Sequence, residues 1–157
     1  MNDATKAERP DVYAIGKKNP NLPFHPAVRA GDFIFVSGQV AKDADGNMIC
    51  GSIEEETKGT IETIQRVLAA DGATLADVVR VTTYLEDTRD FGRYNKVFGE
   101  FFKGAVLART TVEARAVIST KIEMEAIAYK AETKLTWRFG SRQENDDDCI
   151  DRSDLHD

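Results

Sequence analysis

The chain is poor in the residues from which metal centres and nucleophilic active sites are usually built. Its 157 residues include two histidines, His25 and His156, and two cysteines, Cys50 and Cys149. Neither pair has metal-ligand spacing, and a Ser-His-Asp triad would depend on His25, which Pro26 follows directly. We therefore expect no metal site and no such triad. We interpret both cysteines as free thiols of a reducing compartment.

Long apolar stretches are also missing. No run approaches the roughly 20 residues that a membrane helix needs, and the first ten residues, "MNDATKAERP", have no apolar signal core. The two glycines of "GDFIFVSGQ" bracket a predicted strand instead of opening a helix, so this block is not a phosphate or dinucleotide loop. These absences predict a cytoplasmic protein without a membrane partner and without a nucleotide cofactor.

Positive charge is scarce as well. The formal net charge is -6, and the last fourteen residues, "ENDDDCIDRSDLHD", account for it with seven acids and one arginine. Residues 1–143 are therefore close to neutral and have no basic stripe that could follow a phosphate backbone, which disfavours a nucleic-acid partner. We expect the acidic tail to be solvated and disordered.

What the sequence does contain is the pattern of one α+β domain. A chain of 157 residues with 41% hydrophobic residues can bury a single modest core. We predict an irregular lead-in over residues 1–20 with one short strand at 12–15, a domain over residues 21–130, and a C-terminal extension over residues 131–157 that carries the acidic tail.

The expected elements follow from apolar periodicity and turn signals. Strands are predicted over residues 33–40, 48–50, 78–85, 109–117 and 122–129. A first helix is predicted from a capping box of Ser52 and Glu55 to about Gly72, and a second, with an aromatic face, from Asp90 to Gly104. This order indicates a mixed β-sheet with both helices packed on one face.

Four polar residues inside these elements are candidates for chemistry: Ser37, Asn95, Arg109 and Glu123. Each has a simpler interpretation when taken alone, because a strand glutamate or arginine usually lies on a solvated face and an interior serine usually bonds to the backbone. The residues by themselves therefore leave function open.

Together, however, the blocks that contain them resemble a known family. "GDFIFVSGQV", "VLAADGATLADVVRVTTYLEDTRDFGRYNKVFGEFF", "ARTTVEA" and "IEMEAIAY" look like successive blocks of the Rid (reactive intermediate deaminase) family, also called YjgF, from about Pro23 to Tyr129. Members of this family include enamine and imine deaminases. The resemblance implies a chorismate-mutase-like α+β fold that forms a homotrimer with clefts between neighbouring subunits.

The resemblance also implies roles for individual residues. Arg109 would hold the carboxylate of a small-molecule substrate, and Glu123 would position water. Because the two residues lie on consecutive predicted strands, we expect pairing of those strands to bring both groups to one intersubunit cleft. Ser37 and Asn95 would line or support the same cleft, and the backbone of Thr111, where the family often has cysteine, would help to hold the ligand. Arginine suits the first role because its planar guanidinium can make two parallel, charge-assisted hydrogen bonds to a carboxylate.

Several positions depart from the family pattern. Phe24, in "LPF", stands where deaminating members have the tyrosine of "G-P-Y", so an aromatic wall is kept but a hydroxyl is lost. The loop "AVISTK", residues 116–121, lacks the customary "LP" and is one residue short. The alignment through "EMEAIA" favours Glu123 over Glu125 as the water-positioning group, and both belong to one strand face.

The leading hypothesis is a hydrolytic deaminase that converts reactive 2-imino or 2-enamino acids into a 2-oxo acid and ammonia. Imines already hydrolyse unaided, so positioned side chains suffice and no cofactor is implied. One alternative is a deaminase of a larger catabolic enamine acid, such as a 2-aminomuconate or an aminoacrylate. Others are a non-catalytic regulatory trimer that binds a carboxylate ligand, and a ribonuclease-like translation inhibitor.

Overall fold

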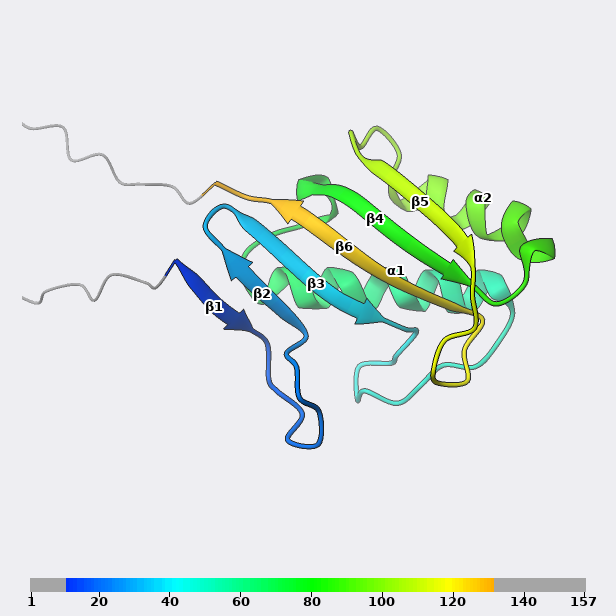
Figure 1. Cartoon of the computed structure of the whole chain (residues 1–157). Coiled ribbons are helices and arrows are strands. Elements are labelled where there is room, and N and C mark those ends of the chain that lie inside the picture. The colour runs from blue at the N-terminus through cyan, green and yellow to red at the C-terminus, as the bar shows by residue number, and fades with distance from the viewer. Residues whose placement is uncertain (1–10, 132–157) are drawn as a thin grey trace, which may run out of the picture.

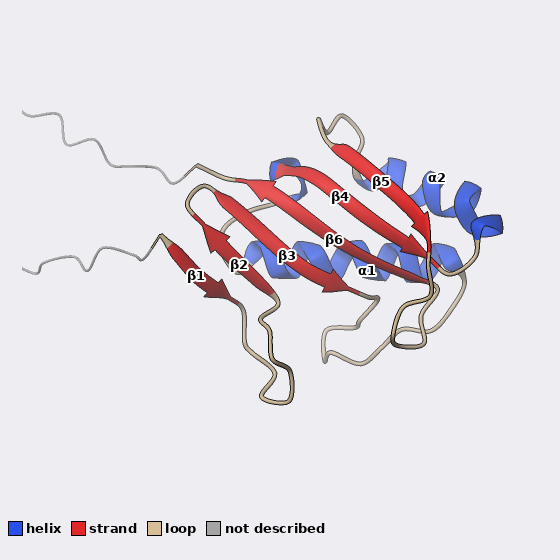
Figure 2. Ribbon diagram, viewed as in Figure 1, coloured by secondary structure: helices blue, strands red, loops and turns tan. Residues whose placement is uncertain are grey.

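One mixed β-sheet runs through residues 11–131, the part of the chain that this computed structural model describes. Its six strands are, in chain order, β1 Val12–Ile15, β2 Ala27–Ala30, β3 Phe33–Gln39, β4 Val78–Leu85, β5 Ala108–Glu113 and β6 Ile122–Tyr129. They lie in the order β1-β2-β3-β6-β4-β5; β4 and β5 run parallel and all other neighbours antiparallel. Helices α1 Ile53–Ala69 and α2 Phe91–Phe101 lie on one face of the sheet (Figures 1 and 2). The predicted mixed sheet with two helices on one face is confirmed.

Helix α1 begins at the capping box that the sequence predicts. The backbone N–H of Glu55 donates to the Ser52 hydroxyl (3.2 Å), and the Ser52 N–H donates to the Glu55 carboxylate (2.7 Å). These bonds satisfy amides that have no partner within the helix. The apolar positions at helical spacing then face the sheet, where they are fully buried: Ile53, Ile61, Ile64 and Leu68.

Strand β6 lies between β3 and β4, in the middle of the sheet. Alternate residues of this strand are buried under the helices: Ile122, Met124, Ala126 and Ala128. The residues between them lie on the opposite face, which no element between residues 11 and 131 covers: Glu123, Glu125, Ile127 and Tyr129. We call this the open face. It also carries Phe33 and Phe35, which are 43% and 46% exposed.

Two predictions about neighbouring strands are wrong. The strand predicted over residues 109–117 ends at Glu113, and residues 114–121 form a loop. Strands β5 and β6 also do not pair with each other, because β4 lies between them (Figure 1). The sequence further gave no sign of β2, which is four residues long and lies between Pro26 and Gly31.

Three smaller predictions differ from the structure: the strand at residues 48–50, the cap of α2 and the end of α2. The strand expected at residues 48–50 is reduced to one isolated bridge between Lys42 and Met48. The Asp90 side chain does not cap α2; it pairs with Arg93, one turn further along the chain. Helix α2 ends at Phe101 instead of continuing to Gly104, which adopts a positive φ of 78° in the following turn.

Other expectations concern the first short strand, the two cysteines, the acidic tail and membrane-spanning helices. The short strand predicted at residues 12–15 forms as β1 and pairs with β2. Cys50 is an exposed free thiol, whereas Cys149, His156 and the acidic tail lie outside the described residues. Among the helices of residues 11–131, none has both the length and the apolar character that crossing a membrane requires.

A close contact between α1 and the chain after β3 gives a test of this packing. A Cβ atom added at Gly59 would lie 2.9 Å from the Ala41 Cβ and 3.3 Å from its Cα, whereas one added at Gly99 in α2 would have nothing within 4 Å. Because Ala41 cannot rotate away, we expect Gly59→Ala to lower the free energy of unfolding by about 1–3 kcal/mol. Gly99→Ala should raise it by about 0.5–1 kcal/mol through helix propensity alone. Urea unfolding of the two variants at equal protein concentration checks this, and equal stabilities would contradict the packing.

Candidate functional site

Arg109 lies on β5 at the edge of the sheet and faces the helices. It pairs in register with Val81, whose side chain is fully buried in the core. Its guanidinium carbon lies 4.6 Å from the ring centre of Phe98, 5.2 Å from that of Tyr94 and 5.9 Å from that of Phe91. The π faces of these three rings attract the cation, so the aromatic face of α2 is a platform for it.

Of the other predicted residues, Asn95 contacts this guanidinium directly, and Thr111 contacts Tyr94, one of the three rings. Asn95 accepts a hydrogen bond from an Arg109 terminal nitrogen at 2.8 Å through its Oδ1 atom. The Thr111 hydroxyl lies 3.5 Å from the Tyr94 hydroxyl, which in turn bonds to Thr83 at 2.9 Å. We call Arg109, Asn95 and Thr111 the arginine half-site. Its cation is fixed by an amide on one side and by aromatic rings below.

Glu123 lies on the open face, directly across from Tyr84 of β4. One oxygen of its carboxylate occupies the space beside Gly38, because a Cβ atom added there would come within 2.1 Å of it. Gly38 lies where the pairing register of β3 and β6 shifts, between Val36 and Gln39. The carboxylate therefore rests against the bare backbone of the "SGQ" block.

Ser37, beside Gly38, holds the approach to the sheet in place. Its hydroxyl donates to the His25 carbonyl at 2.7 Å, and its N–H donates to the Pro26 carbonyl at 3.0 Å. Phe24 precedes this anchored segment, and its side chain is 50% exposed. We call Glu123, Ser37 and Gly38 the glutamate half-site. Ser37 also holds the backbone of His25, the residue after Phe24.

Burial and a neighbouring charge both change the acidity of Glu123. Burial raises its pKa above the ordinary value of a glutamate, and the Glu125 carboxylate on the same strand face raises it further. The charge of Glu125 likewise raises the pKa of Tyr84, whose hydroxyl lies 3.5 Å from a Glu125 oxygen. Glu123 therefore binds a proton more readily than an exposed glutamate does, as a proton-transferring group should.

The two half-sites do not meet within one chain. Arg109 and Val81 share the helix-covered side of the sheet, while Glu123 and Tyr84 share the open face. Strand β4 separates them, so the expectation that pairing of the two strands would bring them together is wrong.

Sequence reasoning missed two features of these half-sites. The aromatic residues of α2 were expected only to form one apolar face of the helix, yet their rings also contact the Arg109 guanidinium. Gly38 was noted only as a strand boundary, and its contact with Glu123 joins positions far apart in the chain. In the part of the chain between residues 11 and 131, no group of three or more His, Cys, Asp or Glu residues could hold a metal ion.

The Gly38 contact predicts a specific effect on Glu123. In Gly38→Ala the new methyl group would displace the end of a flexible side chain, so we expect the free energy of unfolding to change by less than about 1 kcal/mol. The carboxylate should move into solvent, and its pKa should fall towards the ordinary glutamate value. Carbon NMR of the side-chain carboxyl through a pH titration measures this, with Gly92→Ala, which has open space around it, as the control. An unchanged Glu123 pKa in Gly38→Ala would disprove the contact.

Comparison with known proteins confirms the resemblance read from the sequence. A RutC family protein of Pyrococcus abyssi is 46% identical over 121 residues, which cover 76% of this chain and 95% of the relative. The mouse protein named 2-iminobutanoate/2-iminopropanoate deaminase is 33% identical over 108 residues, covering 68% of this chain and 80% of that protein. The crystal structure of yeast Mmf1 superimposes with a TM-score of 0.71 at 25% identity, covering 76% of this chain and 98% of the yeast chain. The family model described as Endoribonuclease L-PSP matches residues 16–130. The chain therefore belongs to the endoribonuclease L-PSP family, which is the YjgF or Rid family.

Proposed function

We propose that this protein is a cofactor-independent hydrolase of small 2-imino and 2-enamino acids, which it converts into 2-oxo acids and ammonia. The observation that carries the proposal is the Arg109 guanidinium, held by Asn95 and laid over three aromatic rings. A cation fixed in this way can bind a planar carboxylate in one orientation, and so fix the position of the adjacent C=N carbon. The name of the mouse relative, at 33% identity, supports the same substrate class.

The reaction needs little beyond positioning and proton transfer. A 2-enamino acid first tautomerises to the 2-imino acid. Water then adds to the C=N carbon: as the new C–O bond forms, Glu123 accepts one proton from the water and the nitrogen takes up one proton from solvent, which gives a neutral carbinolamine. When the C–N bond of the carbinolamine breaks, Glu123 returns its proton to the leaving nitrogen, and the carbinolamine hydroxyl gives its proton to solvent as the C=O bond forms, so ammonia and the 2-oxo acid are released. The raised pKa of Glu123 suits a group that must both accept and return a proton.

We also propose that the working site forms between copies of the chain in a homotrimer. The two half-sites face opposite sides of one sheet, so a second copy has to bring a glutamate half-site to the arginine half-site. The open face carries exposed aromatic rings that such an assembly would bury: Phe33 and Tyr129, whose ring centres are 5.3 Å apart, and Phe35. Exposed apolar patches of this kind favour association between protein surfaces.

A second candidate function is cleavage or binding of RNA. It is favoured by the description of the matching family model, Endoribonuclease L-PSP. The nearly neutral charge of residues 1–143 weighs against it, because RNA affinity depends on basic side chains that neutralise phosphates. A gel-shift and cleavage assay with single-stranded RNA at physiological salt separates the two functions. Binding or cleavage that Arg109→Ala leaves intact would favour the RNA function.

The carboxylate-binding role of Arg109 has a direct kinetic test. We expect purified protein to accelerate the hydrolysis of 2-iminopropanoate and 2-iminobutanoate, measured as slower formation of the semicarbazone when semicarbazide competes for the imine. Arg109→Ala should lower kcat/KM on the order of 10²-fold, because one partner of a charge-assisted pair is lost. Arg109→Lys should fall in between, since lysine keeps the charge but not the two parallel donors.

The matched control for this test is Arg89→Ala. Arg89 is 88% exposed and pairs only locally with Asp87, so its loss should leave kcat/KM unchanged. If wild-type protein gives no rate above buffer with either imine, the proposed reaction is excluded for these substrates. A faster reaction with a larger enamine acid would then point to the catabolic alternative.

Replacement of the Glu123 carboxylate should lower the activity without lowering the stability of the fold. Because its pKa is raised in the folded state, the stability that its protonated form contributes is present at low pH and is lost as the pH rises through that raised pKa. We therefore expect Glu123→Gln to unfold at the same or a higher urea concentration than wild type at pH 7, while kcat falls about 10²-fold through loss of proton transfer. For wild type, kcat/KM should fall on the acid side with a midpoint above the ordinary glutamate pKa.

Glu125→Gln is the comparison variant for this measurement. It should keep most of the activity and move the acid midpoint to lower pH, because one negative charge beside Glu123 is removed. A large loss of kcat in Glu125→Gln, with activity retained in Glu123→Gln, would assign the proton transfer to Glu125 instead.

A further inference from the structure

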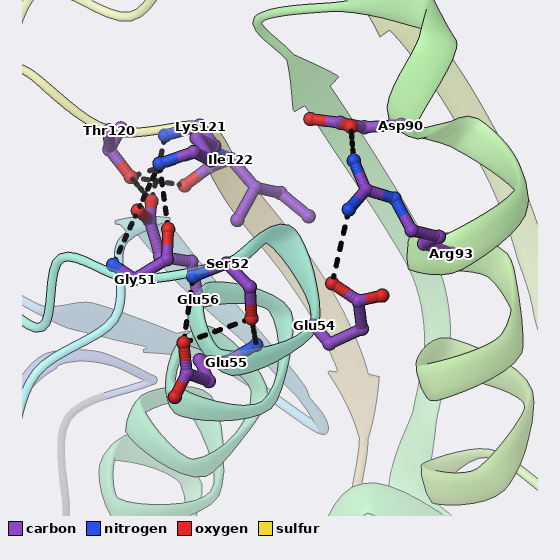
Figure 3. Close-up of polar contacts among 10 residues, drawn as sticks. All are labelled: Gly51, Ser52, Glu54, Glu55, Glu56, Asp90, Arg93, Thr120, Lys121 and Ile122. Atoms are coloured by element: carbon purple, nitrogen blue, oxygen red, sulfur yellow. Dashed lines mark hydrogen bonds and ion pairs between the residues drawn. The ribbon is translucent and has the colours of Figure 1, made fainter.

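A buried carboxylate in the first turn of α1 joins three separate segments of the chain. Glu56 is 2% exposed, and its side chain points away from the helix towards the start of β6 (Figure 3). Its Oε2 atom accepts hydrogen bonds from the Lys121 backbone N–H at 2.8 Å and from the Thr120 hydroxyl at 3.0 Å. Its Oε1 atom accepts from the Gly51 N–H at 3.1 Å and from the Lys121 ammonium at 3.2 Å. Glu56 thus uses both oxygens to tie the chain before α1 to the chain before β6.

The Lys121 ammonium completes this cluster of hydrogen bonds, which joins Gly51, Glu56, Thr120 and Lys121. It donates to the Gly51 carbonyl at 2.7 Å as well as to Glu56, so Gly51 is bonded through both its N–H and its C=O. Burial raises the pKa of Glu56, but the hydrogen bonds from Lys121, Gly51 and Thr120 together outweigh it and lower the pKa below the ordinary value. The carboxylate is therefore ionised at neutral pH, with every partner in place.

The loop that ends at this cluster has few constraints of its own. Residues 114–121, "ARAVISTK", contain neither proline nor glycine, and the Val117 side chain is fully exposed. The loop is attached at its two ends instead. The Ala114 N–H donates to the Leu85 carbonyl at 2.8 Å, and the Glu86 N–H donates to the Lys121 carbonyl at 2.9 Å. At the second end, Glu56 adds the bonds that fix Thr120 and Lys121 from the helix side.

Glu123 follows Lys121 by two residues. Ile122, between them, is buried under the helices, so the chain enters β6 with its alternation already set. Glu123 must then point to the open face, where its carboxylate fits against Gly38 with no room for a methyl group. A small shift of Lys121 along the strand would move the Glu123 carboxylate away from that position.

We propose that Glu56 is a positioning residue for Glu123: by holding Thr120 and Lys121 from the helix side, it sets where the Glu123 carboxylate stands on the opposite side of the sheet. The proposal rests on the role given to Glu123 in the proposed function. Glu56 does not reach the open face and takes no part in proton transfer. It acts through the backbone at the start of β6.

The experiment compares Glu56→Ala with Asp71→Ala. Asp71 is also a buried carboxylate in an ion pair, with Arg29 at 2.7 Å, and it lies just beyond the opposite end of α1. Both variants should be less stable than wild type. Only Glu56→Ala should also lower kcat for imine hydrolysis, by about 10-fold to 10²-fold with little change in KM, because misplacement of a catalytic group acts on the reacting step. Glu56→Gln keeps an oxygen acceptor for the Lys121 N–H and Thr120 but sets a donor NH2 against the Gly51 N–H and the Lys121 ammonium, so it should recover only part of the rate.

A titration of the Glu123 carboxyl tests the proposal without the imine hydrolysis assay. In Glu56→Ala the Glu123 carboxyl should titrate at a different pH from wild type in carbon NMR, and in Asp71→Ala it should not. If Glu56→Ala does not fold, Thr120→Val, which removes one bond to Glu56, takes its place in both measurements. Equal losses of kcat in the Glu56 and Asp71 variants, or an unmoved Glu123 titration in the Glu56 variant, would overturn the proposal. Wild-type protein that hydrolyses no imine would refute the proposed function, and the titration alone would then decide the role of Glu56.

Discussion

The two-residue alternation of β6, in the middle of the sheet, is the constraint on which the rest of the structure depends. Ile122, Met124, Ala126 and Ala128 must all face one way for the core under α1 and α2 to be filled. Once they do, Glu123 and Glu125 can lie only on the open face. A slip of one residue would bury both carboxylates and expose the apolar side chains, so the packing of the core also determines on which face Glu123 lies.

At the edge of the sheet, the strand register likewise determines the face on which Arg109 lies, and this is the face opposite to that of Glu123. Strand β5 runs parallel to β4, and their register gives Arg109 the direction of Val81, towards the helices. No further strand within residues 11–131 covers β5, so Arg109 reaches the rings of α2 and still lies at the margin of the molecule. The aromatic face of α2 consequently serves both the core and the guanidinium. One sheet thus carries a fixed cation on one side and a partly buried carboxylate on the other.

Sequence patterns predicted the elements that carry a strong local signal. The capping box at Ser52, the bounds of β4 and the alternation of β6 all follow from residues close together in the chain. The position of β4 between β5 and β6 does not, because strands that follow each other in sequence need not pair, and only long-range packing decides which do. Strand β2 was missed for the opposite reason: four residues next to a proline and a glycine carry too little periodicity.

The candidate residues also divide into features that the sequence predicts and features that only long-range packing determines. The resemblance of the sequence blocks named Arg109 and Glu123, and comparison with known proteins confirmed the family, but neither gives the direction of a side chain. Only the sheet register shows that the two residues face opposite sides. The contact of Gly38 with Glu123 and the bonds of Glu56 to Lys121 likewise join distant positions, which no local pattern reveals.

The central claim is that one active site takes Arg109 from one copy of the chain and Glu123 from another. Co-expression of Arg109→Ala with Glu123→Gln, each of which should lose most of its activity when made alone, tests it most directly. A mixed assembly can pair an intact arginine half-site with an intact glutamate half-site, so imine hydrolysis should return in the co-expressed sample. The two variants expressed separately and assayed side by side should each keep only their low activity. If mass spectrometry shows mixed assemblies and their activity is no higher than that of either variant, the claim is contradicted.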